Sequence, residues 1–351
     1  MVPYSGKALL SLLILALGLS GCMSSSTQAT GTRQMLSPLT PEIQSRAQTL
    51  RAITQNDVLC ESTLSLDTFY FYSAFPEEFA SRATALGLNT ISFRLDMENL
   101  SDSQYRENLS NFIAMLNLVD IKVSLLAADY DFHYVRSRYF WAGNHAEQVQ
   151  EKLNQIVALC DYLGQQGAKV DGFSLILTPE KQKNLSSGQS PDALFSWRSN
   201  GFGPNGDNDH VWQKSLQLAQ QLRDTIALPQ TLILSSDICA AGDKGLLTGA
   251  KASELLSSGV HNLILVAEAP DSNRIMEKLD IILQSTDSPD VLAAGLYIHE
   301  HPLGSARSVR RFTFDQFATI VGAVQKNCSE HPSFAGIYYG DFAALESAWE
   351  W

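Results

Sequence analysis

Basic side chains are scarce in this sequence. The 351 residues include 25 Lys and Arg against 37 Asp and Glu, which gives a formal net charge of −12 at pH 7. Because phosphate binding needs clustered Lys and Arg, this balance argues against nucleic acid as a partner. The hydrophobic fraction of 45% is that of a globular protein. Length alone allows one large barrel or two ordinary domains.

Sequence motifs of metal, nucleotide and serine chemistry are absent. The five cysteines form no C-x-x-C pair and no Cys/His ligand spacing, which argues against a zinc site. No Gly-rich phosphate turn or Walker pattern follows the first predicted strand, and the chain has no G-x-S-x-G nucleophile elbow. His299 and His301 share one side of a strand with Glu300 opposite, so they form only a weak metal motif. We therefore expect no metal and no cofactor.

The N-terminus carries an apolar run that is too short to span a bilayer comfortably. This run, residues 8–19, follows Lys7 and has the features of a secretory signal. It ends in Leu19-Ser20-Gly21-Cys22, which resembles the bacterial lipobox. The resemblance implies that the signal is cleaved before Cys22 and that Cys22 is lipidated, so that acyl chains hold the protein to a membrane.

The residues after the signal predict a tether. Residues 23–45 are polar and lack periodicity. We expect a signal peptide at 1–21, a lipidated N-terminus and tether at 22–60, and a folded body at 61–351. Residue 23 is Met rather than the Asp that retains many similar lipoproteins at the inner membrane, so this resemblance favours a cell-envelope location at the outer membrane.

The body alternates short β-rich runs with helical segments eight times. The β-rich runs consist mostly of Ile, Leu, Val, Phe and Tyr, as expected of strands buried on both faces. This pattern predicts an α/β fold, a single (β/α)8 TIM barrel over residues 61–351, with a doubly wound open sheet as the alternative. The predicted strands are residues 68–75, 90–97, 122–128, 172–178, 231–237, 262–268, 295–300 and 336–341.

Two cysteines stand near the predicted seam of the barrel. Cys60 precedes the first predicted strand and Cys328 precedes the last, and these two strands are neighbours in a closed barrel. Because an exported protein can oxidise its thiols, we predict a disulfide between Cys60 and Cys328. Buried free cysteines are the alternative.

Ionisable side chains gather at the carboxyl ends of the predicted strands, where barrels hold their functional sites. Arg94 and Asp96 share strand parity, so both face the same side of the sheet. The loops after the third and fourth strands are rich in aromatic side chains, which can stack on sugar rings. The predicted substrate-binding residues are Arg94, Asp96, Asp129, Asp131, Tyr139, Trp141 and Trp197.

The fourth predicted strand carries a family resemblance. Residues 170–179 resemble the motif D-G-x-x-x-D-x-E-P of bacterial glycosidase-superfamily barrels related to chitinase-like enzymes, and the resemblance could cover residues 65–345. In that family the Glu protonates the glycosidic oxygen and the Asp tunes the pKa of that Glu. This chain retains Asp171-Gly172 but has Ile176 in place of the Asp and Thr178 in place of the Glu. The resemblance therefore implies a glycosidase-like barrel without its usual acid.

The replacement of the motif's Asp and Glu by Ile176 and Thr178 leaves two candidate functions. The first is a cell-envelope lipoprotein whose barrel binds polysaccharide or an envelope protein without hydrolysis, which Ile176 and Thr178 favour. The second is an active glycoside hydrolase with a relocated pair of carboxyl groups, which normally lie ~5–10 Å apart across a cleft. The candidate catalytic acids for this alternative are Glu180, Asp237, Glu268 and Glu300.

Overall fold

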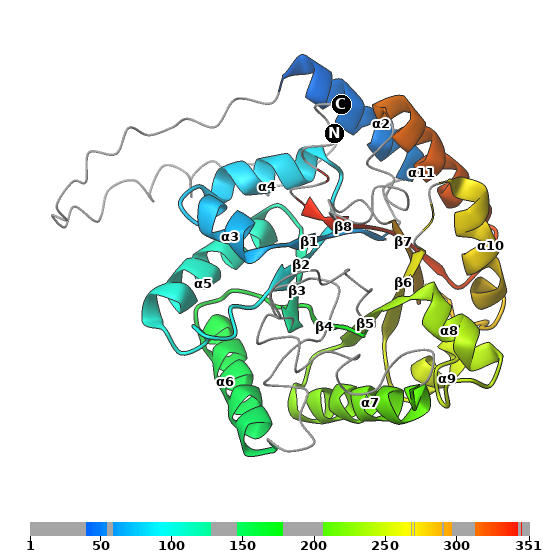
Figure 1. Ribbon diagram of the computed structural model, residues 1–351. Helices are drawn as coiled ribbons and strands as arrows, with labels where there is room; N and C mark the ends of the chain where they lie inside the picture. Colours follow the sequence, from blue (N-terminus) through cyan, green and yellow to red (C-terminus); the bar gives the residue numbers. More distant parts are fainter. Residues whose placement is uncertain are drawn as a thin grey trace, which may run out of the picture. The chain divides into compact units, whose positions relative to one another are not determined.

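Within the described residues, eight parallel strands close into a barrel with helices around it (Figure 1). The computed structural model describes residues 40–54, 59–127, 146–177, 206–267, 269, 271–289, 291–296, 313–342 and 345. The strands are β1 Leu59–Leu64, β2 Thr90–Arg94, β3 Lys122–Ala127, β4 Gly172–Ile176, β5 Gln230–Ser235, β6 Asn262–Ala267, β7 Leu292–Leu296 and β8 Phe334–Asp341. Each strand pairs with the next and β8 pairs with β1, so the predicted (β/α)8 TIM barrel is confirmed.

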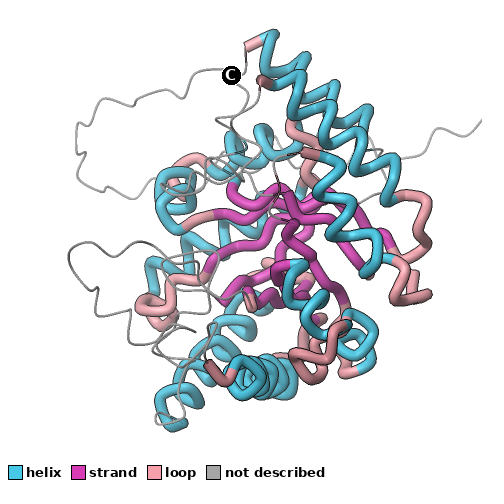
Figure 2. Tube along the Cα trace, turned by 45° about the vertical axis from the view of Figure 1, so that its right-hand side comes forward, coloured by secondary structure: helices cyan, strands magenta, loops and turns pink. Residues whose placement is uncertain are grey.

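Helices cover the outside of this barrel, as Figure 2 shows. Several of them begin at an acidic side chain that caps the first turn: Asp102 accepts from the Tyr105 N–H, and Asp207 accepts from the His210 N–H. No helix in the described ranges is long and apolar enough to cross a membrane. The helices are α2 Pro41–Thr54, α3 Leu66–Tyr72, α4 Pro76–Ala85, α5 Ser103–Leu118, α6 Ala146–Gln165, α7 Asn208–Thr225, α8 Ser236–Asp243, α9 Ala252–Ser257, α10 Ser272–Leu283 and α11 Phe314–Cys328.

The first strand lies earlier in the chain than the sequence predicted. We expected a strand at residues 68–75, but most of that range belongs to the helix α3, and the first strand is β1. The Ser65 hydroxyl accepts a hydrogen bond from the Thr68 N–H at 3.1 Å and caps the first turn of α3. This cap stabilises the start of a helix in an aromatic run of strand-like composition.

The reason for the error lies in two kinds of side chain. Phe69 and Tyr72 are spaced as on one face of a helix and both are buried, but aromatic residues are also enriched in strands. In β1 the buried Glu61 interrupts the apolar pattern that marks a strand. The other predicted strands overlap the observed ones. The clearest shift is at β7, which begins at Leu292 rather than at residue 295.

A helix that precedes β1 completes the outer layer. α2 packs between α4 and α11 (Figure 1). The Arg46 guanidinium of α2 lies 5.3 Å from the centre of the Phe314 ring at the start of α11. Further along both helices, a Cβ on Gly322 would lie 3.7 Å from Ile53 Cγ2. The two helices therefore run parallel, and α2 stands beside the β8–β1 seam, where the helix after β8 stands in a regular barrel.

The compact unit consequently starts at Leu39, earlier than the boundary expected at residue 61. We expected residues 22–60 to be a tether, but this range includes α2 and the start of β1. Ala47, Leu50 and Thr54 recur at helical spacing and are buried. Too few apolar residues mark this helix for its periodicity to stand out in the sequence.

One half of the barrel interior is apolar. Leu126, Ile176, Ile233, Ile264 and Ala293 form a buried cluster with Tyr338. Their strands run consecutively from β3 to β8, and large branched side chains fill this part of the barrel as in other barrels of the class. The interior at the end of β4 is therefore packed with hydrocarbon.

The other half of the interior is polar. Ser124 and Ser174 precede Leu126 and Ile176 by two residues, so they face the same side of the sheet. The Ser124 and Ser174 hydroxyls are 2.5 Å apart, and the Ser92 and Ser174 hydroxyls are 3.3 Å apart. The Ser92 hydroxyl also donates to the Glu61 carboxyl. A hydrogen-bonded chain thus links the first four strands and satisfies a carboxyl group that is 3% exposed.

The predicted disulfide is not formed, because Cys60 and Cys328 are both free thiols. Cys60 lies within β1 rather than before the first strand. Cys328 ends α11, where its Sγ is 3.6 Å from the Met276 Sδ of α10. Burial raises the pKa of each thiol to about 12, so both remain protonated near neutral pH.

Glu61 makes the stability of the barrel depend on pH. Burial raises the pKa of Glu61 from 4.5 to about 7, and the hydrogen bond from Ser92 offsets part of this rise. The protonated carboxyl is therefore preferred in the folded state, and its contribution to stability is lost as the pH rises from about 4.5 through about 7. We expect the free energy of unfolding to fall by about 3 kcal/mol over this range relative to Glu61→Gln, measured by urea denaturation.

The exposed Glu107→Gln variant on α5 is the matched control, and its curve should run parallel to that of the wild type. If Glu61→Gln shows the same pH dependence as the wild type, Glu61 does not hold a proton in the folded barrel.

Candidate functional site

The described part of the candidate site lies where β1 and β2 end. A single residue, Ser65, separates β1 from α3, so α3 stands at the carboxyl-end face of the barrel. Asp96 lies just after β2 on the same face. The Tyr70 hydroxyl of α3 donates to Asp96 Oδ2 at 2.5 Å, and Asn99 Nδ2 donates to the same oxygen at 2.8 Å. The Glu98 N–H donates to Asp96 Oδ1 at 3.1 Å.

The start of α5 holds this loop in place. The Asp96 N–H donates to the Tyr105 hydroxyl at 2.9 Å. Tyr105 lies in the first turn of α5, and its own N–H is bonded to the capping Asp102. The side chain of Tyr105 is 3% exposed, so it anchors the loop from inside the protein. The position of the Asp96 carboxylate is therefore fixed through both its backbone and its side chain.

The hydrogen bonds decide the charge of Asp96. Burial raises the pKa of Asp96, but the donors on Tyr70 and Asn99 and the N–H groups of Glu98 and Asn99 outweigh it and hold the pKa below its ordinary value. Burial and the Asp96 carboxylate raise the pKa of Tyr70 to about 12. Asp96 is thus an ionised acceptor and Tyr70 a neutral donor near neutral pH, and neither is suited to donate a proton to a substrate.

Arg94 is the last residue of β2 and is 6% exposed. It follows Ser92 by two residues, and Ser92 belongs to the polar interior, so Arg94 lies on the barrel side of the strand. Arg94 and Asp96 are therefore near neighbours at the rim of the barrel. Their shared parity in the sequence had predicted that both face one side.

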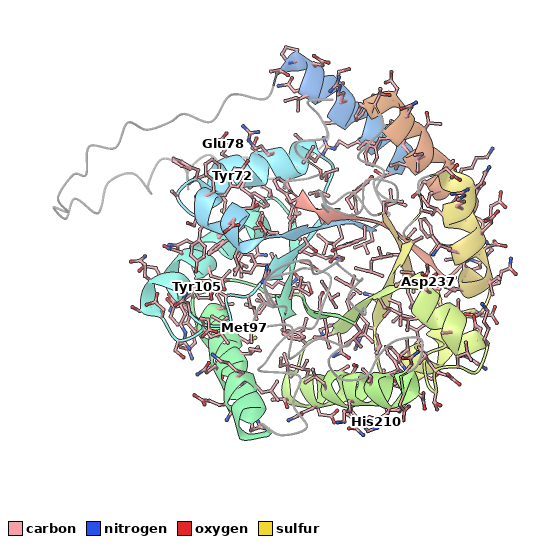
Figure 3. All side chains as sticks on the ribbon, viewed as in Figure 1. Tyr72, Glu78, Met97, Tyr105, His210 and Asp237 are labelled. Carbon is pink, nitrogen blue, oxygen red and sulfur yellow. The ribbon has the colours of Figure 1, made fainter. Side chains whose placement is uncertain are left out.

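Asp237 lies apart from this group. It is in the first turn of α8, its side chain is 70% exposed, and its Oδ1 is 2.7 Å from Lys278 Nζ of α10. Figure 3 shows Asp237 across the barrel from Met97 and Tyr105, the neighbours of Asp96. The structure therefore does not bring Asp237 together with Asp96 as a catalytic pair.

Most other predicted site residues lie outside the described residues. Within the described ranges, no group of three or more His, Cys, Asp or Glu side chains could hold a metal ion. The predicted residues outside these ranges are Cys22, Asp129, Asp131, Tyr139, Trp141, Thr178, Glu180, Trp197, Glu268 and Glu300.

Ile176, at the position of the Asp in the resembling family, is described. Its side chain is 3% exposed and belongs to the apolar cluster inside the barrel. Ile176 pairs in register with Ile233 of β5, which belongs to the same cluster. This position therefore contributes packing and offers no polar group to a ligand.

The sequence analysis missed Tyr70, Phe71 and Asn99. The side chains of Tyr70 and Phe71 are 45% and 52% exposed. The signal for them was present in the aromatic run of residues 69–72, but we assigned that run to a strand. Asn99 follows Asp96 by three residues, a spacing that allows a side-chain contact within one turn.

The fold is similar to that of glycoside hydrolase barrels. No protein-family model matches the sequence, and no curated protein matches it. A GH18 chitinase from Pseudoalteromonas aurantia is 12% identical, with a TM-score of 0.51 over 82% of this chain and 96% of the chitinase. The xylanase XynB from Paenibacillus barcinonensis is 10% identical, with a TM-score of 0.48 over 86% of this chain and 88% of its own. A D-psicose 3-epimerase from Clostridium cellulolyticum H10 is also 10% identical, with a TM-score of 0.44 over 84% of this chain and 95% of the epimerase.

Replacing Tyr70 by Phe tests the electrostatics of the site. Tyr70→Phe removes the hydroxyl donor and keeps the ring, so the pKa of Asp96 should rise toward its ordinary value. An NMR titration of the aspartate carboxyl carbons measures this change directly. The Phe71→Leu variant leaves the hydrogen bonds intact and should leave the titration of Asp96 unchanged. An unchanged Asp96 titration in Tyr70→Phe would refute the assigned hydrogen bond.

Proposed function

We propose that this protein is a lipid-anchored cell-envelope protein whose barrel binds polysaccharide at its carboxyl-end face without hydrolysing it. The observation that carries the proposal is the burial of Ile176 in the apolar cluster inside the barrel. In the resembling glycosidase-superfamily barrels this position holds the Asp that tunes the catalytic acid, and this chain has Thr178 where those barrels have that acid. An isoleucine packed among hydrocarbon cannot tune the pKa of an acid, and a threonine cannot donate a proton to the glycosidic oxygen.

The described carboxyl groups also support binding without hydrolysis. Glycoside hydrolysis needs a carboxyl group that donates a proton and, except where the substrate itself assists, a second carboxyl group roughly 5–10 Å away across the cleft. Asp96 is held in its ionised form by Tyr70 and Asn99. Asp237 is paired with Lys278 in the helical layer on the other side of the barrel. These two residues are arranged as structural acceptors and not as an acid and a nucleophile.

The choice of polysaccharide as the ligand rests on the strand-four resemblance and on the rim. The chitinase-like motif at residues 170–179 keeps its Asp171-Gly172 start. At the barrel rim Arg94 and Asp96 are nearly buried, and the side chain that stands exposed beside them is Tyr70, which is bonded to Asp96 and has the apolar ring and polar tip that suit a sugar. We propose no cofactor and no nucleic-acid partner for this site.

The proposed anchor would hold the binding face near the membrane. α11 follows β7 and so begins at the carboxyl-end face of the barrel, and α2 runs parallel to it. Pro41, the first residue of α2, therefore lies on the same face as Asp96. Residues 23–40 are 18 residues long and can span at most roughly 60 Å from a lipidated Cys22. We propose the outer membrane as the anchoring membrane.

Binding and turnover are measured together on the chain from Met23 onward. We expect binding to a polysaccharide on a glycan array, with no release of reducing ends over long incubation. Released reducing ends would overturn the non-hydrolytic proposal and direct mutagenesis to Glu180, Glu268 and Glu300. If no glycan is retained, polysaccharide is not the ligand, and an envelope protein becomes the partner to search for.

Replacing Cys22 tests the anchor. The full chain expressed in a bacterium should partition with membranes and incorporate labelled palmitate, because acyl chains on Cys22 bury methylenes in the bilayer. Cys22→Ser should abolish the label and release the protein from the membrane fraction. The Cys160→Ser variant on α6 keeps the proposed anchor and is the matched control. Membrane retention of Cys22→Ser would contradict lipidation at this residue.

A further inference from the structure

The helix α3 lies across the ends of three neighbouring strands. Its Tyr70 is bonded to Asp96, which follows β2. Its Tyr72 packs against Phe342, which follows β8, with the ring centres 6.3 Å apart. Because α3 itself follows β1, it forms the rim of the barrel from β8 to β2. A ligand that covers this edge of the barrel mouth must contact α3.

Two aromatic rings on α3 are exposed and yet held in place. Tyr70 is 45% exposed, and its hydroxyl is bound to Asp96 Oδ2, which Asn99 also contacts. Phe71 is 52% exposed and packs edge-on against the buried Tyr72, with the ring centres 5.0 Å apart and the planes at 84°. A buried polar group thus orients one ring and a buried aromatic ring orients the other. Such preorganised rings lose little conformational entropy when a ligand binds.

These two rings differ from the other exposed apolar side chains in the described part of the chain. The others are the aliphatic Leu118, Val119, Leu246 and Ile281. Leu118 ends α5, so it lies at the opposite, amino-end face of the barrel. Among the described residues, exposed aromatic rings are therefore confined to the face that carries Asp96.

The chemistry of the rim indicates the class of ligand. Rigid aromatic rings beside hydrogen-bonding groups suit a molecule with one apolar face and polar edges, as a pyranose ring has. Acidic groups lie near Tyr70: besides burial, Asp96 and Asp102 raise the pKa of Tyr70, and Asp67 is in the first turn of α3. This field and the net charge of −12 disfavour an anionic polymer.

We propose that Tyr70 and Phe71 form an aromatic subsite for a neutral or positively charged sugar at the β1–β2 edge of the barrel mouth. Asp96 and Asn99 position the Tyr70 ring, and the exposed ring faces of Tyr70 and Phe71 stack on the sugar. The inference rests on the proposed polysaccharide-binding function and specifies where and what kind of sugar the protein takes.

The test measures the affinity of the chain from Met23 onward for three β-1,4- or α-1,4-linked hexasaccharides by calorimetry. The probes are neutral N-acetylglucosamine, cationic glucosamine and anionic galacturonate oligomers. We expect the wild type to bind a neutral or cationic probe, and Phe71→Ala and Tyr70→Ala each to weaken that binding at least about tenfold. Leu118→Ala, at the opposite face, should stay within about twofold of the wild type.

Circular dichroism and thermal melting establish that each variant is folded. If Tyr70→Ala does not fold, Phe71→Ala decides the test alone, because its side chain is half exposed and its loss leaves the core intact. Wild-type binding that survives both substitutions would overturn the subsite while leaving the polysaccharide-binding function standing. Binding of the anionic probe alone would overturn the proposed ligand class. A wild type that binds no glycan, on this panel or on the array, would overturn both the subsite and the function.

Discussion

Closure of the barrel between β1 and β8 is the constraint on which the rest of the structure depends. Leu59 of β1 pairs with Gly336 of β8, where φ is +147° and any Cβ would collide with the Leu59 carbonyl. Only glycine allows the two strands to approach at this point. The pairing of Leu59 with Gly336 sets the register of β1 against β8, and this register determines where along the barrel β1 ends. The end of β1 in turn puts α3, with Tyr70 and Phe71, at the rim.

The sequence predicted the barrel well and its first strand badly, and one physical cause explains both outcomes. A strand such as β6 is an almost continuous apolar run because both of its faces are buried, so composition identifies it. β1 instead has Glu61 facing a polar interior, and no local pattern distinguishes it from a loop. Because aromatic residues are also common in strands, we predicted the first strand at the aromatic residues of α3 instead. We predicted Asp96 as a site residue but not its partner Tyr70, because we assigned the helix that carries Tyr70 to a strand.

The divided interior shows what the fourth strand contributes to the core. On β4, Ser174 joins the hydrogen-bonded chain to Glu61, while Ile176, two residues on, joins the apolar cluster. An aspartate at position 176 would put a carboxylate among Leu126, Ile233 and Ile264, which costs far more than it gains without a partner. The packing of this barrel is thus adapted to isoleucine, and polar contacts with a ligand are left to the rim.

The direction of α2 determines which end of the barrel lies nearest to the proposed lipid anchor at Cys22. α2 runs parallel to α11, with Arg46 beside Phe314 and Ile53 beside Gly322, so it descends from the carboxyl-end face toward the start of β1. The chain therefore enters the barrel beside the rim that carries Tyr70 and Asp96. Under the proposed lipidation of Cys22, residues 23–40 could span at most roughly 60 Å between the membrane and the start of α2. The proposed anchor and the proposed polysaccharide-binding rim therefore lie at the same end of the barrel.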